Sequence, residues 1–177
     1  MSDLRLSKMF MTQLSGLLKR ISEKEEFAIE DAGRLLSQSF LGEGSIYMKG
    51  FDEMAAIEIE ALYGAEVLSS IKRWTEGAPL TEADRVLVAA RFSDDPNALQ
   101  LARQLQANGI PFAAIASKKE EPGIEELADV FIDLRLIKGL LPDDKGGRAG
   151  FPSSIAGLYV YFLIKMTIEE IAAEYED

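Results

Sequence analysis

The chain has 177 residues and a net charge of -11, from 30 acidic and 19 basic side chains. This length suits one domain, expected over residues 1–177, and the charge disfavours sequence-independent binding to nucleic acid or to anionic membranes. Because the chain has no cysteine and no histidine, disulfides, thiolate chemistry and the commonest general base are excluded. The first residues lack the apolar core of a secretion signal, so we expect a cytoplasmic protein.

The first half of the chain alternates between helical and strand patterns. Apolar residues recur at spacings of three and four in two N-terminal stretches, which is typical of amphipathic helices. A glycine-containing turn at 50–53 separates the first strand from the next helix, and residues 71–80 read as a connection. The predicted elements are helices over 4–21 and 25–40, a strand over 45–49, a helix over 54–63 and a short strand over 66–70.

The stretch from Leu80 to Ser117 predicts a βαβ unit. An aliphatic run over 85–90 is followed by a polar turn with capping side chains and a proline suited to a first helical turn. A helical stripe then ends at Asn108-Gly109, and a second apolar run covers 110–116. The two strands of this unit are therefore expected to be parallel. A fifth strand is expected over 129–133. In such sheets the ligand site lies beyond the carboxyl ends of the strands.

The last part of the chain predicts a flexible loop and then an unusually apolar helix. Residues 140–150 contain one proline, two aspartates and three glycines, which is typical of a flexible loop. The apolar run 155–164 is far shorter than the roughly 20 residues that cross a bilayer, so we expect no membrane partner. A helix that is apolar on most sides needs several neighbours, and we favour a contact with a second copy of the chain.

Three segments of the chain resemble the SIS, or sugar isomerase, domain family, and its phosphoheptose-isomerase branch most closely. They are EEFAIEDAGRLLSQSFLGEGSIYMKGFDE, LTEADRVLVAARFSDDPNALQLARQLQANGIPFAAIAS and IEELADVFIDL, in the order and at the spacing of that family. The resemblance implies an α/β three-layer sandwich with a five-stranded parallel sheet in flavodoxin-like order. It divides the chain into a helical segment (1–41), an α/β core (45–135) and a C-terminal helix (151–174). It also implies a homodimer or homotetramer.

The resemblance implies that the turns after the strands hold a phosphorylated sugar. The turn RFSDDPN matches the position of the family's phosphate loop, although two aspartates stand where that loop has hydroxyls and a glycine. Its candidate ligand-binding residues are Arg91, Ser93, Asp94 and Asn97. The alternative for this turn is a helix cap made by Ser93 or Asp94.

The turn after the first predicted strand offers two further ligand-binding candidates, Gly50 and Asp52. Gly50 matches the family's glycine-rich turn. The alternative is a glycine that allows a positive φ angle, followed by acids (Asp52 and Glu53) that interact with the helix dipole.

Glu58 and Glu60 are the catalytic candidates, because the resemblance places them where the phosphoheptose branch has residues facing its active site. Residues two apart on a helix lie about 200 degrees apart, so only one of them can face a pocket. That glutamate would shuttle a proton between adjacent sugar carbons through an enediol. The branch's histidine partners are absent, which also argues against its metal site. We therefore expect no metal and no cofactor.

Two more groups complete the candidate ligand-binding set. Lys145, Arg148, Ser153 and Ser154 bring cations and hydroxyls to a predicted helix N-terminus, where an anion is favoured. The alternative is a solvated hinge with capping serines. Ser117, before two lysines, is a candidate of the same kind.

The leading hypothesis is a sugar-phosphate-binding SIS-domain protein, either an aldose–ketose isomerase of phosphoheptose-isomerase type or a protein without that activity. The alternative class is a non-catalytic effector-binding or scaffold protein that keeps the fold and the oligomer, and the missing histidines favour it. A receiver-like domain would explain Asp94 and Asp95 through magnesium binding, but not the two leading helices.

Overall fold

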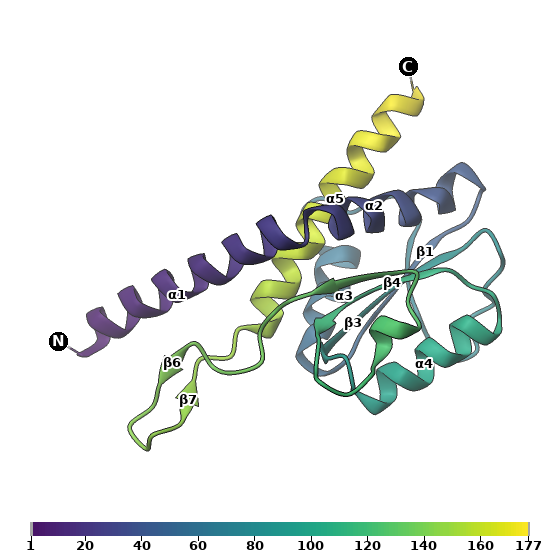
Figure 1. Cartoon of the computed structure of the whole chain (residues 1–177). Coiled ribbons are helices and arrows are strands. Elements are labelled where there is room, and N and C mark those ends of the chain that lie inside the picture. The colour runs from purple at the N-terminus through teal and green to yellow at the C-terminus, as the bar shows by residue number, and fades with distance from the viewer. Residues whose placement is uncertain (1, 177) are drawn as a thin grey trace.

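The computed structural model describes residues 2–176, and its centre is a sheet of five parallel strands (Figure 1). The strand order is β2-β1-β3-β4-β5. The predicted fold class, a five-stranded parallel sheet in flavodoxin-like order between layers of helices, is therefore confirmed. The strands are β1 (Ile46–Gly50), β2 (Ile71–Arg73), β3 (Arg85–Phe92), β4 (Phe112–Ser117) and β5 (Val130–Asp133).

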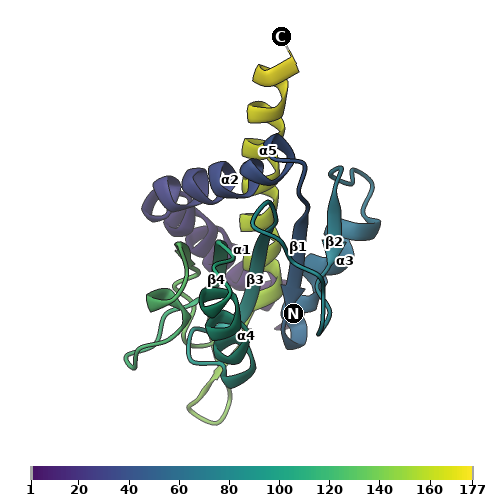
Figure 2. The same ribbon diagram turned by 90° about the vertical axis from the view of Figure 1, so that its right-hand side faces the viewer.

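Helices cover both faces of this sheet (Figure 2). One face packs against α2, α3 and α5, with α1 packed outside them on α2 and α5, and the other face packs against α4 and a short 3-10 turn, η2. A second 3-10 turn, η1, lies between β1 and α3. Their bounds are α1 (Ser2–Lys24), α2 (Glu26–Leu41), η1 (Asp52–Met54), α3 (Ala55–Tyr63), α4 (Pro96–Ala107), η2 (Ile124–Glu126) and α5 (Ser153–Glu176).

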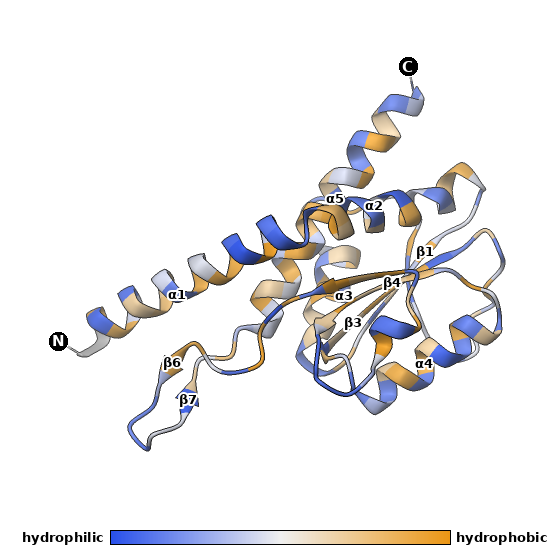
Figure 3. Cartoon of the chain, viewed as in Figure 1, coloured by the Kyte–Doolittle hydropathy of each residue, from blue (hydrophilic) through white to orange (hydrophobic). Residues whose placement is uncertain are grey.

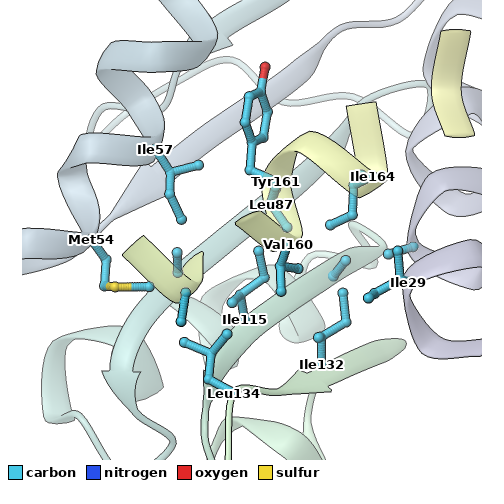
Figure 4. Packing of buried hydrophobic residues seen from close by; sticks show 14 of the residues in the cluster. Ile29, Met54, Ile57, Leu87, Ile115, Ile132, Leu134, Val160, Tyr161 and Ile164 are labelled. Carbon is cyan, nitrogen blue, oxygen red and sulfur yellow. The ribbon is translucent and has the colours of Figure 1, made fainter. Parts of the chain in front are cut away.

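The central strands are buried on both faces because their side chains alternate between two apolar clusters. In β3, Leu87 and Ala89 point to the α5 side of the sheet, whereas Val86 and Val88 point to the α4 side. Figure 4 shows Leu87, Ile115 and Ile132 from three neighbouring strands facing side chains of α5. This alternation explains why the strands read as continuous apolar runs in the sequence.

Helix α4 begins at the polar turn where the sequence predicts it, although a different residue of that turn forms the cap. The Asp95 carboxylate accepts a hydrogen bond from the Ala98 N–H at 2.8 Å, and Pro96 occupies the first helical position. The cap proposed for Ser93 or Asp94 is therefore made by Asp95.

The prediction of a strand over 66–70 is wrong, because the edge strand β2 begins at Ile71, after the predicted end and inside the stretch predicted as a connection. Ser70 has a φ of 65°, a left-handed turn conformation in which a strand cannot continue. Its carbonyl accepts a hydrogen bond from the Ile46 N–H at 2.9 Å, which aligns Ile71 with Ile46. The edge strand itself is mostly exposed, so no apolar run marks it in the sequence.

The predicted flexible loop at 140–150 contains an ordered hairpin. Strands β6 (Leu141–Pro142) and β7 (Arg148–Ala149) pair antiparallel, and the Asp143 carboxylate accepts hydrogen bonds from the N–H groups of Lys145 and Gly147 at 2.8 and 2.6 Å. The sequence shows the turn residues of this segment but not its short pairing.

Helix α5 has its apolar partners within the chain along its first half. It packs against α2 and α3 through residues such as Val160, Tyr161 and Ile164. Its C-terminal end and the N-terminal end of α1 extend beyond the sheet in different directions, and α1 has one apolar and one polar side (Figure 3). Among residues 2–176, no helix has both the length and the apolar character needed to span a bilayer.

Candidate functional site

An open hollow of about 420 Å³, called the cavity below, lies at the carboxyl end of β3. It is lined by Glu53 from η1, Arg91 and Phe92 from the end of β3, and Phe151 and Ser153 from the entry to α5. The strand order reverses between β1 and β3, so the cavity lies at the topological switch point of the sheet. Ligands of open α/β sheets bind at such points.

One carboxylate joins the polar side chains of this cavity. Glu53 Oε1 accepts hydrogen bonds from Arg91 Nε at 2.7 Å and from Ser153 Oγ at 2.9 Å, and Glu53 Oε2 forms an ion pair with Arg91 Nη2. The hydrogen bond from Arg91 lowers the pKa of the Glu53 carboxyl, and the same contact raises the pKa of Arg91. Both groups are therefore charged at neutral pH.

Two aromatic rings form the apolar wall of the cavity. The Phe92 and Phe151 rings pack edge to face with their centroids 5.7 Å apart, and the Lys119 ammonium lies 4.5 Å from the centroid of the Phe92 ring. The cavity thus combines a charged hydrogen-bonding side with an apolar side, which is typical of small-molecule sites.

The turn after β1 is shaped by close backbone packing. A Cβ on Gly50 would lie 2.2 Å from the Met54 carbonyl oxygen, so only glycine fits there. The φ angle of Gly50 is not positive, and the left-handed residue of the turn is the exposed Asp52, with a φ of 52°. The Phe51 N–H donates to the Ala89 carbonyl at 2.9 Å, which fixes the turn beside β3. This packing positions Glu53.

The two catalytic candidates lie apart from the cavity. Glu58 is only 6% exposed, and its carboxylate accepts a hydrogen bond from the Gly50 N–H at 2.9 Å and lies 3.8 Å from Arg73 Nε. Glu60 is half-buried on α3. Its charge helps to raise the pKa of the buried Tyr161 hydroxyl to about 12, an effect that comes mainly from burial. Neither glutamate lines the cavity.

Ser93 and Ser117 are buried in a network that connects the turns after β3 and β4. The Ser93 hydroxyl accepts from the Lys119 N–H at 3.0 Å, and the Ser93 N–H donates to the Ser117 carbonyl at 2.9 Å. The Ser117 hydroxyl accepts from the Leu136 N–H at 3.1 Å. These two residues are 0% and 1% exposed, so ligand contact would require the network to open.

The remaining candidates lie outside the cavity lining. Asp94 lines a separate hollow of about 350 Å³ with Lys118 and Lys119, and Asn97 is exposed on α4. The Arg148 guanidinium donates to the carbonyls of Gly139 and Leu140, both at 2.9 Å, and so holds the hairpin. Ser154 is half-buried beside Ser153, and Lys145 lies at the hairpin tip.

Sequence reasoning does not select three of the five lining residues, Glu53, Phe92 and Phe151. For Glu53 it predicts only an interaction with the helix dipole. The signal for Glu53 is its place in the turn after β1, at the switch point, together with an arginine near the end of the neighbouring strand β3. Among residues 2–176, no group of three acidic side chains is arranged to hold a metal ion.

Comparison with solved structures shows which class of protein has this fold. The chain aligns with a phosphoheptose isomerase from Francisella tularensis with a TM-score of 0.70 and 13% identity, over 96% of this chain and 99% of that chain. It aligns with the sugar isomerase domain of the RpiR transcription factor from Sphaerobacter thermophilus with a TM-score of 0.61 and 15% identity, over 95% of this chain and 89% of that chain. The fold is therefore that of the sugar isomerase, or SIS, domains.

A third solved structure of this fold contains a ligand. The Vibrio vulnificus NanR protein complexed with ManNAc-6P aligns with a TM-score of 0.63 and 11% identity, over 95% of this chain and 67% of that chain. The fold thus occurs in a protein that binds a phosphorylated sugar.

Sequence comparison shows the family. The model of the family described as "Domain of unknown function (DUF2529)" matches residues 6–172, and the chain belongs to this family. A relative from Bacillus subtilis (strain 168), "Uncharacterized protein YwjG", is 39% identical over 170 residues, which cover 95% of this chain and 98% of that protein.

Proposed function

We propose that the chain binds a sugar phosphate, or a related phosphorylated metabolite, in the cavity at the end of β3. The observation that carries this proposal is the convergence of Arg91 and Ser153 on one carboxylate. A guanidinium fork and a hydroxyl are groups that bind the oxygens of phosphates and carboxylates. The complex of NanR with ManNAc-6P, which has the same fold, supports this ligand class.

Binding without catalysis is the form of this function that the residues favour. The Glu58 carboxylate already accepts a hydrogen bond from the Gly50 N–H, and the chain has no histidine to share proton transfer. The alternative, an aldose–ketose isomerase of phosphoheptose-isomerase type, would depend on Glu60. An assay of isomerisation with heptose and pentose phosphates distinguishes the two, because only the alternative predicts turnover that Glu60→Gln abolishes.

A thermal-shift panel tests the binding proposal. A sugar phosphate at 100 times its dissociation constant should raise the free energy of unfolding by about 2.7 kcal/mol. Arg91→Ala should remove this gain because it removes the cation of the cavity. Arg103→Ala, which changes an exposed residue on α4, should retain it.

The panel contains pentose phosphates, heptose phosphates and hexosamine phosphates, ManNAc-6P among them, each with and without Mg²⁺. Failure of every phosphate to stabilise the protein would contradict the proposal. Stabilisation by Mg²⁺ alone would favour the receiver-like alternative.

We also propose that the chain forms a homodimer or homotetramer through the extended ends of α1 and α5. Large apolar side chains are exposed on both helices, with Leu6, Met11, Met166 and Tyr175 each at least half exposed. Sedimentation equilibrium should give two or four times the chain mass of 19.5 kDa. The mass of a single chain at micromolar concentration would contradict this proposal.

A further inference from the structure

The contacts of Glu53 are those that a bound oxyanion would make. Its two carboxylate oxygens face the Nε and Nη2 groups of Arg91, and one of them also accepts the Ser153 hydroxyl. A phosphate presents oxygens to an arginine fork in the same way. The Arg91 donors that face the cavity and the buried Ser153 hydroxyl are therefore already occupied by a group of the chain itself.

Three separate parts of the chain position this arrangement. Asp52, with its φ of 52°, turns the chain out of β1, and the Phe51 N–H anchors that turn to Ala89 of β3. Arg91 extends from the end of β3 with its side chain 45% exposed, and Ser153 is 3% exposed at the first turn of α5. The backbone thus places Glu53 between Arg91 and Ser153, and hydrogen bonds from both residues hold its carboxylate, whose side chain is 29% exposed.

The charges around Arg91 also oppose a second anion. Asp52 and Asp95 act on the Arg91 guanidinium in addition to Glu53. Three carboxylates therefore act on one arginine, and the nearby Lys119 ammonium lies over the Phe92 ring. A phosphate dianion would meet net negative charge here unless Glu53 moved away from Arg91.

We propose that Glu53 is a specificity-determining residue: its carboxylate occupies the oxyanion subsite made by Arg91 and Ser153 and competes with the phosphate of a ligand for these two groups. This inference rests on the proposed function, because it concerns the same cavity. Simple phosphate binds weakly to the native chain, and a ligand gains entry only when its other contacts in the cavity help to displace Glu53. Neutralising Glu53 converts the cavity into an open phosphate site.

Calorimetric titration with inorganic phosphate tests this inference directly. Glu53→Gln and Glu53→Ala should each bind phosphate at least about tenfold more tightly than the wild type, since each frees Arg91 from its carboxylate partner. The double change Glu53→Gln with Arg91→Ala should lose this gain. The matched control is Glu30→Gln, which removes one charge from a different arginine–glutamate pair, on α2, and should bind phosphate as the wild type does.

Thermal unfolding of each variant confirms that it is folded before titration. Equal phosphate affinity in the wild type and both Glu53 variants, or no phosphate binding by folded Glu53 variants, would overturn the inference. Sugar phosphates that stabilise the wild type without any gain in Glu53→Gln would overturn this inference and leave the proposed function standing. Tight phosphate binding by Glu53→Gln, with no sugar phosphate bound by any variant, would support the inference and reject the proposed function.

Discussion

Replacing Phe112 with alanine should lower the free energy of unfolding by about 3–5 kcal/mol. Phe112 is 1% exposed at the start of β4 and packs with residues such as Val86 and Leu105 in the core between the sheet and α4. The substitution loses the burial of a large aromatic ring and leaves a cavity in a close-packed core that relaxes only partly. Urea denaturation followed by circular dichroism measures the loss as a lower midpoint at unchanged slope.

Phe27→Ala is the matched control for this prediction, because it removes the same ring from a side chain that is 79% exposed on α2. Its free energy of unfolding should stay within about 0.5 kcal/mol of the wild type. If Phe112→Ala and Phe27→Ala had the same urea midpoint, the burial of β4 between β3 and β5 would be wrong.

Replacing Gly50 with alanine should lower the free energy of unfolding by about 1–3 kcal/mol. The new Cβ would lie 2.2 Å from the Met54 carbonyl oxygen and 2.7 Å from the Ala55 nitrogen, both backbone atoms, so η1 would have to move. Because η1 carries Glu53, the same substitution should also disturb the Glu53–Arg91 pair. Chemical denaturation measures the loss of stability, and the phosphate titration measures the change at the site.

Gly16→Ala provides the comparison for Gly50, since it makes the same chemical change inside a helix where space is available. The nearest atom to its new Cβ is the flexible end of Arg20 at 3.7 Å. Alanine should raise the free energy of unfolding there by about 1 kcal/mol through its higher helix propensity. A free energy of unfolding that does not fall in Gly50→Ala would contradict the close packing at the end of β1.

The sequence is sufficient for most of the fold because burial leaves a clear pattern. Strands β3 and β4 are buried on both faces, so they appear as unbroken apolar runs, and Asp95-Pro96 marks the start of α4. The edge strand β2 is misplaced by the sequence pattern because its residues are largely exposed and carry no apolar run. The sequence does not predict the hairpin at 140–150, because two paired residues in each strand are too few to give a strand pattern.

The candidate site is less predictable, because side-chain direction depends on tertiary packing. Sequence reasoning selects Arg91 and Ser153, and the structure places both at the cavity, although their ligand role stays a prediction. Ser93 and Ser117 have the residue type of a phosphate loop but face inward, where they accept backbone hydrogen bonds. The sequence predicts only an interaction of Glu53 with the helix dipole, because no local pattern shows that Glu53 contacts Arg91 and Ser153.

The position of a bound sugar phosphate tests the central claim most directly. A crystal structure of the wild-type chain with ManNAc-6P, or with the sugar phosphate of the panel that stabilises it most, should show the phosphate within hydrogen-bond distance of Arg91 Nε and Ser153 Oγ. The Glu53 carboxylate should have moved away from both groups. A sugar phosphate bound at another place, with the contacts of Glu53 to Arg91 and Ser153 intact, would contradict the claim that this cavity is the ligand site.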